Sequence, residues 1–159
     1  MNIRKPAAGF TIIELLIVLV VIGILSTLVI TTYSGVQSKN RNNDRQANID
    51  TLQGQLETYY AQHSMYPTLA NLNDTEWRKA NLKALATDGL KDPSWNKDNK
   101  TCTADGTAIA SNEPTDNCYA YQVTTADGSA CDNKATPCAQ YTLTAKLEGS
   151  GKYVKSSLN

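Results

Sequence analysis

One acidic residue, Glu14, lies inside an apolar run that extends from Phe10 to Ile30. An ionised carboxylate in hydrocarbon costs about 2.5–3.5 kcal/mol even on the insertion scales with the lowest penalties. A segment that served only as an anchor would have an apolar residue at this position. Glu14 therefore predicts a positively charged partner, and the residues before it indicate which partner this is.

A short basic leader, residues 1–9, precedes the apolar run. It contains one arginine, one lysine and no acid, and it ends in the small residues Ala-Ala-Gly. An ordinary signal peptide loses its apolar region of about 7–15 residues together with the leader. Here, cleavage between Gly9 and Phe10 would remove only the leader and would create a new amino group at Phe10. Glu14 would then be the fifth residue, about one helical turn from that amine.

The residues GFTIIELL at positions 9–16 resemble the class III signal and the N-terminal segment of type IV prepilins and pseudopilins. The resemblance is specific over about residues 4–35 and continues beyond them only as general architecture. It implies cleavage after Gly9, N-methylation of Phe10 by a membrane prepilin peptidase, and assembly of the mature subunit into a helical fibre. It also implies that Glu14 pairs with the Phe10 amine of a neighbouring subunit. Such a pair relieves two unpaired charges and sets the axial register.

The apolar run is also a candidate membrane span, because about 20 apolar residues cross a bilayer as a helix. Basic residues beside a first span tend to stay in the cytoplasm. We therefore expect one pass of the cytoplasmic membrane over residues 10–35 before assembly, with the rest of the chain outside, and an extracellular fibre afterwards. The partners that the resemblance implies are further copies of the chain, the prepilin peptidase, the membrane and the pilus assembly platform.

The helix is expected to continue as a stalk, from about Thr11 to about Gln62. Over residues 36–62 the apolar residues recur at spacings of three and four, which predicts an amphipathic helix lying against a globular domain. The members of this stripe are Ile49, Leu52, Leu56, Tyr59 and Tyr60. The charges over Lys39–Arg45 are expected to form a solvated face close to the membrane.

Three glycines, Gly23, Gly35 and Gly54, lie within the expected stalk. Glycine inside a helix costs about 1 kcal/mol relative to alanine. Each position is therefore a candidate either for close helix packing or for local melting during assembly. Many type IVa pilins have a proline where this chain has Thr31, so the glycines are the candidate hinges here.

Residues 63–159 predict a small globular head. The helix is expected to break near His63–Pro67, because proline fixes φ and disfavours helix at the residue before it. A second helix is expected over Thr75–Ala86, with Asp74 as its N-cap and Gly89 after its end. The long polar segment Lys91–Asn117 is expected to be an exposed irregular loop.

Alternation of apolar and polar residues predicts two strands in the head, and a third is expected after the turn at residues 149–151. They begin near Tyr119, Tyr141 and Tyr153. We expect an antiparallel meander of these strands packed on the apolar stripe of the stalk. The expected fold class is α+β, a long N-terminal helical stalk packed on a small antiparallel sheet, and the lollipop of pilins is the same arrangement by resemblance.

The four cysteines, Cys102, Cys118, Cys131 and Cys138, all lie in the head. The expected orientation places them outside the cytoplasm, where disulfides persist. Three pairings are open, and we favour Cys102–Cys118 and Cys131–Cys138. The first would tie the long loop to the start of a strand, and the second would close the connection between two strands.

No cofactor and no catalytic group is expected, because the sequence contains no nucleophile–base pair, zinc cluster or phosphate loop. Asp127 and Asp132 are weak calcium candidates, since their stretch lacks EF-hand spacing. Removal of the leader leaves 13 of the 15 basic side chains against 15 acidic ones. A slightly acidic fibre is not a strong polymer for nucleic acid, and contacts through a few local lysines stay open.

Three functions fit these observations. The favoured one is a structural subunit of a type IV pilus, and the two predicted disulfides and the weak calcium signal lean towards it. The alternatives are a pseudopilin of a type II secretion system and a membrane-anchored extracellular enzyme or binding protein.

Overall fold

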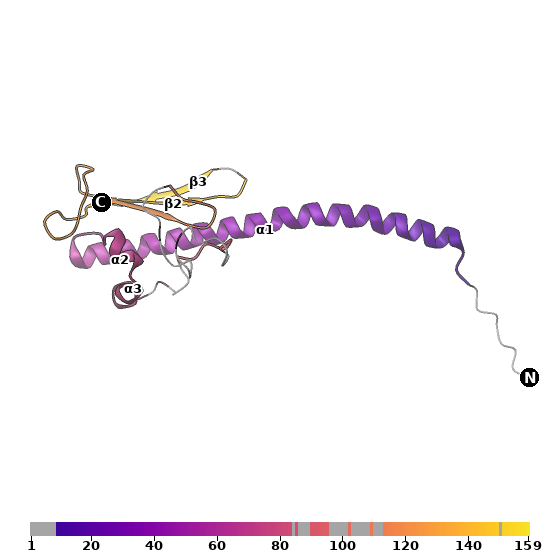
Figure 1. The fold of residues 1–159 in the computed structure, drawn as a ribbon, viewed down its shortest axis with the longest axis horizontal. Helices are drawn as coiled ribbons and strands as arrows, with labels where there is room; N and C mark the ends of the chain where they lie inside the picture. Colours follow the sequence, from indigo (N-terminus) through magenta and orange to yellow (C-terminus); the bar gives the residue numbers. More distant parts are fainter. Residues whose placement is uncertain are drawn as a thin grey trace, which may run out of the picture. The chain divides into compact units, whose positions relative to one another are not determined.

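The computed structural model describes residues 9–83, 85, 90–95, 102, 109, 113–149 and 151–159, with only the helical backbone described for residues 28–32. Its elements follow in the order of one long helix, two short helices and three strands (Figure 1). The chain divides into two compact units, Met1–Gln37 and Ser38–Asn159. The long helix contributes residues to both units.

The long helix, α1, runs from Ile12 to His63. It begins one residue after Thr11, and it ends where Ser64 takes a positive φ of 54°. Pro67 follows three residues later and prevents the chain from resuming the helix. The expected bounds, Thr11 and Gln62, thus agree with the structure to within one residue. The helix is continuous through its three glycines.

Within the unit Met1–Gln37, the described apolar side chains are exposed. The exposed fraction is 87% for Phe10, 85% for Ile12 and 48% for Val21. In the part of the chain that the structure describes, no helical stretch reaches the length and hydropathy required to cross a membrane.

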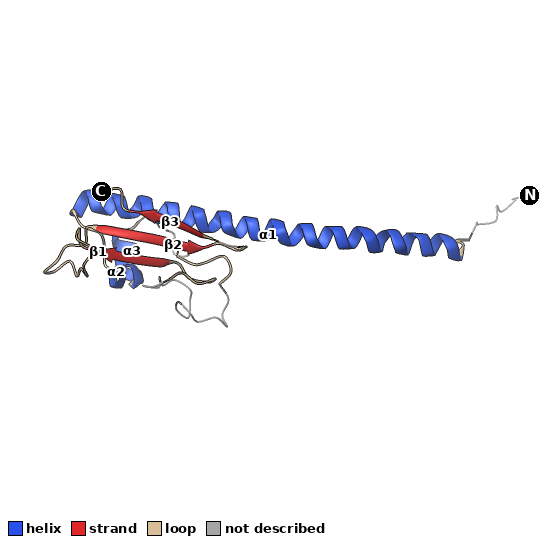
Figure 2. Ribbon diagram, turned by 90° about the horizontal axis from the view of Figure 1, so that it is seen from above, coloured by secondary structure: helices blue, strands red, loops and turns tan. Residues whose placement is uncertain are grey.

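The unit Ser38–Asn159 has a core between α1 and a sheet of three antiparallel strands (Figure 2). The strands are β1 (Ala120–Thr124), β2 (Gln140–Lys146) and β3 (Lys152–Ser156), and they lie in the order β1-β2-β3. The register pairs Tyr121 with Leu143 and Ala145 with Tyr153. The expected α+β fold, with a long helix packed on a small antiparallel sheet, is confirmed.

The apolar stripe of α1 supplies one side of this core. Ile49, Leu52 and Leu56 are each at most 1% exposed, and Tyr59 and Tyr60 pack at the border of the cluster. From the sheet, alternate residues of β2 face the helix, as the period of two requires. The core residues of β2 are Tyr141, Leu143 and Ala145.

Two short helices follow the stalk in place of the single helix expected over Thr75–Ala86. Helix α2 spans Leu69–Asn73 and was not expected, although Thr68 and Asn71 form a capping box at its start. Helix α3 spans Thr75–Asn81, and Asp74 caps it as expected by accepting hydrogen bonds from the backbone N–H groups of Glu76 and Trp77. The expected helix was too long, because the chain turns at Leu82 to bury that side chain. Ala86 and Gly89 lie outside the described residues.

Two disulfides hold the irregular parts of this unit. Cys102 is bonded to Cys118 and Cys131 to Cys138, with Cα–Cα distances of 5.8 and 5.2 Å. Much of the segment Lys91–Asn117 lies outside the described residues. Among its described residues, Ile109 is 2% exposed, and Asp92 and Pro114 are also buried, so at these points the expectation of an exposed loop was wrong. The side chain of Asn73 bonds both the N–H and the C=O of Ile109, which holds this apolar residue in the core.

Candidate processing and assembly site

The start of α1 is closed by a reciprocal pair of side chains, Thr11 and Glu14. The Thr11 backbone N–H and hydroxyl both donate to Oε2 of Glu14, at 2.8 and 2.9 Å. In return, the Glu14 N–H donates to the Thr11 hydroxyl oxygen at 3.2 Å. This is the capping box of Thr at the N-cap and Glu three residues later, which satisfies N–H groups that a helix start leaves unpaired.

The capping box uses only one oxygen of the Glu14 carboxylate. The other oxygen, Oε1, accepts no hydrogen bond from any described residue. Glu14 therefore caps its own helix and still has a full acceptor available for a second donor. The negative charge also lies at the positive end of the helix dipole, where it is favourable.

Gly9 and Phe10, the expected processing residues, directly precede this capping box and lie outside α1. A side chain added at Gly9 would meet no described atom within 4 Å. The packing of this chain therefore does not require a glycine there. The same accessibility leaves the Gly9–Phe10 bond open to another protein.

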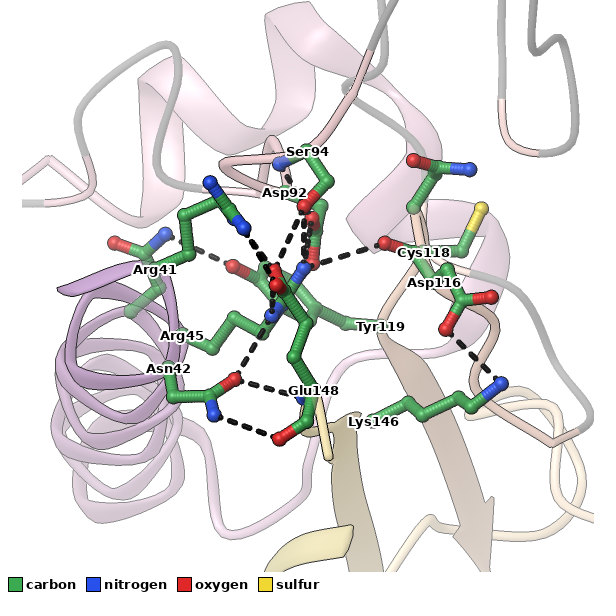
Figure 3. Close-up of polar contacts among 12 residues, drawn as sticks. Arg41, Asn42, Arg45, Asp92, Ser94, Asp116, Cys118, Tyr119, Lys146 and Glu148 are labelled. Carbon is green, nitrogen blue, oxygen red and sulfur yellow. Dashed lines mark hydrogen bonds and ion pairs between the residues drawn. The ribbon is translucent and has the colours of Figure 1, made fainter. Parts of the chain in front are cut away.

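A second polar constellation lies where α1 meets the sheet (Figure 3). We call it the arginine clasp, and it consists of Arg41, Asn42, Arg45, Asp92, Ser94 and Glu148. Arg45 is 1% exposed and forms a two-pronged ion pair with Asp92, at 2.8 and 3.0 Å. Such fork-to-fork geometry is the strongest form of this pair.

The clasp also holds the turn between β2 and β3 through Glu148. Arg41 donates to both carboxylate oxygens of Glu148 at 2.6 Å, and Arg45 donates to one of them at 3.0 Å. The Asn42 amide bonds the backbone N–H and C=O of Glu148 at 2.9 and 3.1 Å. The hydrogen bond from Arg41 is the main cause that holds the pKa of Glu148 well below its usual range.

The clasp corrects the expectation of a solvated face over Lys39–Arg45 for two of its charges, whereas Lys39 and Asp44 are exposed as expected. Within this range Arg45 is buried and Arg41 is half-buried, because both pair with acids of the head. Arg45 precedes Ile49 by four residues and so continues the apolar stripe of α1. That register was the available sequence signal for its burial, whereas its acid partners are 47 and 103 residues distant.

The calcium candidates Asp127 and Asp132 lie in separate turns. Asp132 accepts hydrogen bonds from the backbone N–H groups of residues 134–136, and these bonds lower its pKa to about 2. Asp127 accepts from the hydroxyl of Thr125 and from the N–H of Ser129. Among the described residues, no group of three or more His, Cys, Asp or Glu side chains is placed to hold a metal ion.

Comparison with known proteins places the N-terminal residues in a defined class. Residues 4–30 match the family model described as the prokaryotic N-terminal methylation motif. The start of the chain therefore carries this motif, in agreement with its resemblance to prepilins and pseudopilins. No solved structure gives a significant match to the chain.

The curated relatives that match include proteins named type II secretion system core protein G. The chain is 35% identical over 65 residues to the protein of Dickeya chrysanthemi, and this match covers 41% of the chain and 42% of the relative. It is 33% identical over 60 residues to the protein of Klebsiella pneumoniae, and this match covers 38% of the chain and 43% of the relative. For Aeromonas hydrophila the identity is 31% over 65 residues, covering 41% and 46%. The chain thus spans less than half the length of these relatives.

Proposed function

We propose that the chain is a structural subunit of a type IV pilus, a pilin that polymerises through its N-terminal helix. A prepilin peptidase cleaves it between Gly9 and Phe10 and methylates the new amine at Phe10. Glu14 then accepts the Phe10 amine of a neighbouring subunit and fixes how far one subunit is displaced from the next. The role is one of assembly, not of catalysis.

The observation that supports this proposal is that a carboxylate oxygen without a described donor lies at the start of a helix whose apolar side chains are exposed. Glu14 keeps Oε1 available at the start of α1. The described apolar side chains that follow it, up to Val36, are about half exposed or more. A soluble monomer rarely exposes so much contiguous apolar surface. A membrane before assembly, and neighbouring helices after it, would cover this surface.

This proposal divides the chain by role. Residues 1–9 are the leader, residues 10–35 the membrane anchor and fibre core, residues 36–62 the amphipathic continuation, and residues 63–159 the extracellular head. Before assembly the chain would cross the cytoplasmic membrane once, with the head outside. Its partners would be further copies, the peptidase, the membrane and the pilus assembly platform.

A second candidate is a pseudopilin of a type II secretion system. The specific observation in its favour is that the matching relatives are type II secretion system core proteins G, although each match covers less than half of the relative. The two disulfides favour the pilus, because covalent cross-links stabilise the subunits of a fibre outside the cell against unfolding. Both candidates share the same processing and the same assembly contact.

The test is to shear surface fibres from cells that express the chain and to determine the N-terminal residue of the subunit. The proposal expects fibres built from a chain that begins at methylated Phe10. A mature chain that begins elsewhere would contradict it. To separate the two candidates, the gene is deleted: loss of surface fibres supports the pilus, and loss of secreted cargo with intact fibres supports the pseudopilin.

A further inference from the structure

The part of α1 that carries the head leaves one face uncovered. Exposed residues recur at spacings of three and four on the side opposite the buried stripe. The helical period places them on one face. They include Asn40, Asn43, Ala47, Gly54, Thr58 and Ala61.

The charges on this part of α1 divide into two groups. Four are engaged by the head, namely Arg41 with Glu148, Arg45 with Asp92, Asp50 with Lys155 and Glu57 with the hydroxyl of Tyr141. The other two, Lys39 and Asp44, are exposed and have no ion-pair or hydrogen-bond partner among the described residues. Within the described part of the chain, one positive and one negative charge of this helix are therefore left without an internal partner.

We propose that this face receives α1 of a second copy of the chain, and that Asp44 of one copy pairs with Lys39 of the next. The inference rests on the proposed function, since it assumes a fibre of parallel subunits. It adds a second charged contact to that of Glu14, and it places this contact outside the apolar segment.

The spacing of the charges supports this partner. Lys39 and Asp44 are five residues apart, about 7.5 Å along the helix axis, and Phe10 and Glu14 are four residues apart, about 6 Å. In both pairs the positive group comes first in the chain. If two parallel helices are displaced along their axes by four to five residues, Glu14 of one copy lies level with the Phe10 amine of the next. The same displacement brings Asp44 of the first copy level with Lys39 of the second.

The small residues on the same face permit a close approach of two helices. A side chain added at Gly54 would meet no atom of the described chain within 4 Å. Its own packing thus gives no reason for glycine, which is the least favourable helix residue after proline. Ala47 and Ala61 lie seven residues to either side of Gly54, so the neighbouring helix would meet only short side chains along this line.

The test reverses the charges singly and together in the full chain. Lys39→Glu and Asp44→Lys each replace attraction by repulsion. The double variant Lys39→Glu/Asp44→Lys restores an opposite pair. The control is Lys134→Glu, which reverses an exposed lysine of the head loop that forms no ion pair with a described residue. Sheared fibre per cell is measured at low salt, because salt screens exposed pairs.

We expect each single reversal to lower the fibre yield by about fivefold, near the upper limit for one exposed pair, and the double variant to recover it. Single variants that match the Lys134→Glu control, or a double variant as poor as the singles, would overturn the inference. If the wild-type chain forms fibres in that experiment, the proposed function stands even when the inferred pair fails. A wild-type chain that is cleaved but never forms fibres would contradict the proposed function itself.

A second measurement does not depend on yield. Fibres grown from a mixture of isotope-labelled and unlabelled chains are treated with a carbodiimide, which couples a lysine directly to a carboxylate. A mixed-label peptide that joins Lys39 to Asp44 is expected from fibres and not from detergent-dispersed monomer. Mixed-label cross-links elsewhere in the fibre, without this one, would contradict the pair.

Discussion

Thr11 and Glu14 form a reciprocal pair at the start of α1, in which Thr11 donates twice to one carboxylate oxygen, while the other oxygen has no donor among the described residues. Glu14 is thereby oriented by its own chain before any neighbour arrives. A carboxylate held in one rotamer loses less conformational entropy when a second donor binds. The capping box thus prepares the group that the proposed assembly contact uses.

This relationship predicts different results for two changes at Thr11. Thr11→Ala removes the hydroxyl and is expected to weaken the helix start by about 1 kcal/mol. It should also lower fibre yield, because Glu14 loses one of its orienting donors. Thr11→Ser keeps the hydroxyl and should behave like the wild type. Amide hydrogen exchange over the first turn of α1 in detergent, together with fibre yield, checks both. Equal behaviour of the two variants would contradict the orienting role.

The arginine clasp predicts a large loss of stability when Arg45 is replaced. Arg45→Met leaves Asp92 buried without its partner, which costs about 3–5 kcal/mol for a buried pair. The matched control is Lys79→Met, which breaks an exposed pair with Glu76 and should cost at most about 1 kcal/mol. Denaturant unfolding followed by tryptophan fluorescence measures both. Equal losses in the two variants would show that the clasp is not a stability element.

The lowered pKa values of Glu148 and Asp132 predict how the free energy of unfolding decreases at acid pH. A carboxyl group whose pKa is lower in the folded state stabilises the fold above its unfolded pKa, near 4. That contribution is lost as the pH falls towards the folded value, which is about 2 for Asp132. Unfolding free energy should therefore decrease between about pH 4 and pH 2. The decrease should be smaller in Asp132→Asn, and an unchanged slope in that variant would contradict the assignment.

The two disulfides predict an order of stabilisation. Cys102 and Cys118 are separated by 16 positions, and Cys131 and Cys138 by 7. In the chain-entropy account a longer closed loop stabilises more, here about 3 against about 2.5 kcal/mol. Replacing each pair by serines should thus destabilise the head in both cases, with a slightly larger loss for the first pair. Denaturant unfolding of the two double variants compares them, and a stable head without either bridge would contradict the prediction.

The sequence predicted the elements whose signals are local. The apolar stripe through Ile49, Leu52 and Leu56 identified the buried side of the stalk, and alternation identified the strands. The capping box of Thr11 and Glu14 is equally visible in the sequence as Thr-x-x-Glu, but the role of Glu14 as a cap was not predicted. Helix α2 has only five residues, too few to show a period.

The arginine clasp could not be predicted as a set, because contacts between residues 47 and 103 positions apart depend on the folded topology. Arg45 precedes Ile49 by four residues, and this register could have indicated its burial, although a solvated face was expected there. The register could not identify Asp92 and Glu148 as the partners. Charged residues at a stripe position are thus a signal for a buried pair, and the fold determines the pair.

The measurement that tests the account most directly replaces Glu14 and scores processing and assembly separately. Glu14→Ala and Glu14→Gln remove the charge, and Glu14→Asp keeps it on a shorter side chain. We predict normal cleavage after Gly9 in all three. Fibre yield should fall by at least about tenfold in the two neutral variants, with a partial loss in Glu14→Asp, since one pair with the Phe10 amine is lost in every subunit contact. Normal incorporation of cleaved Glu14→Ala subunits into fibres would contradict the central claim that this carboxylate pairs with the amine of a neighbour.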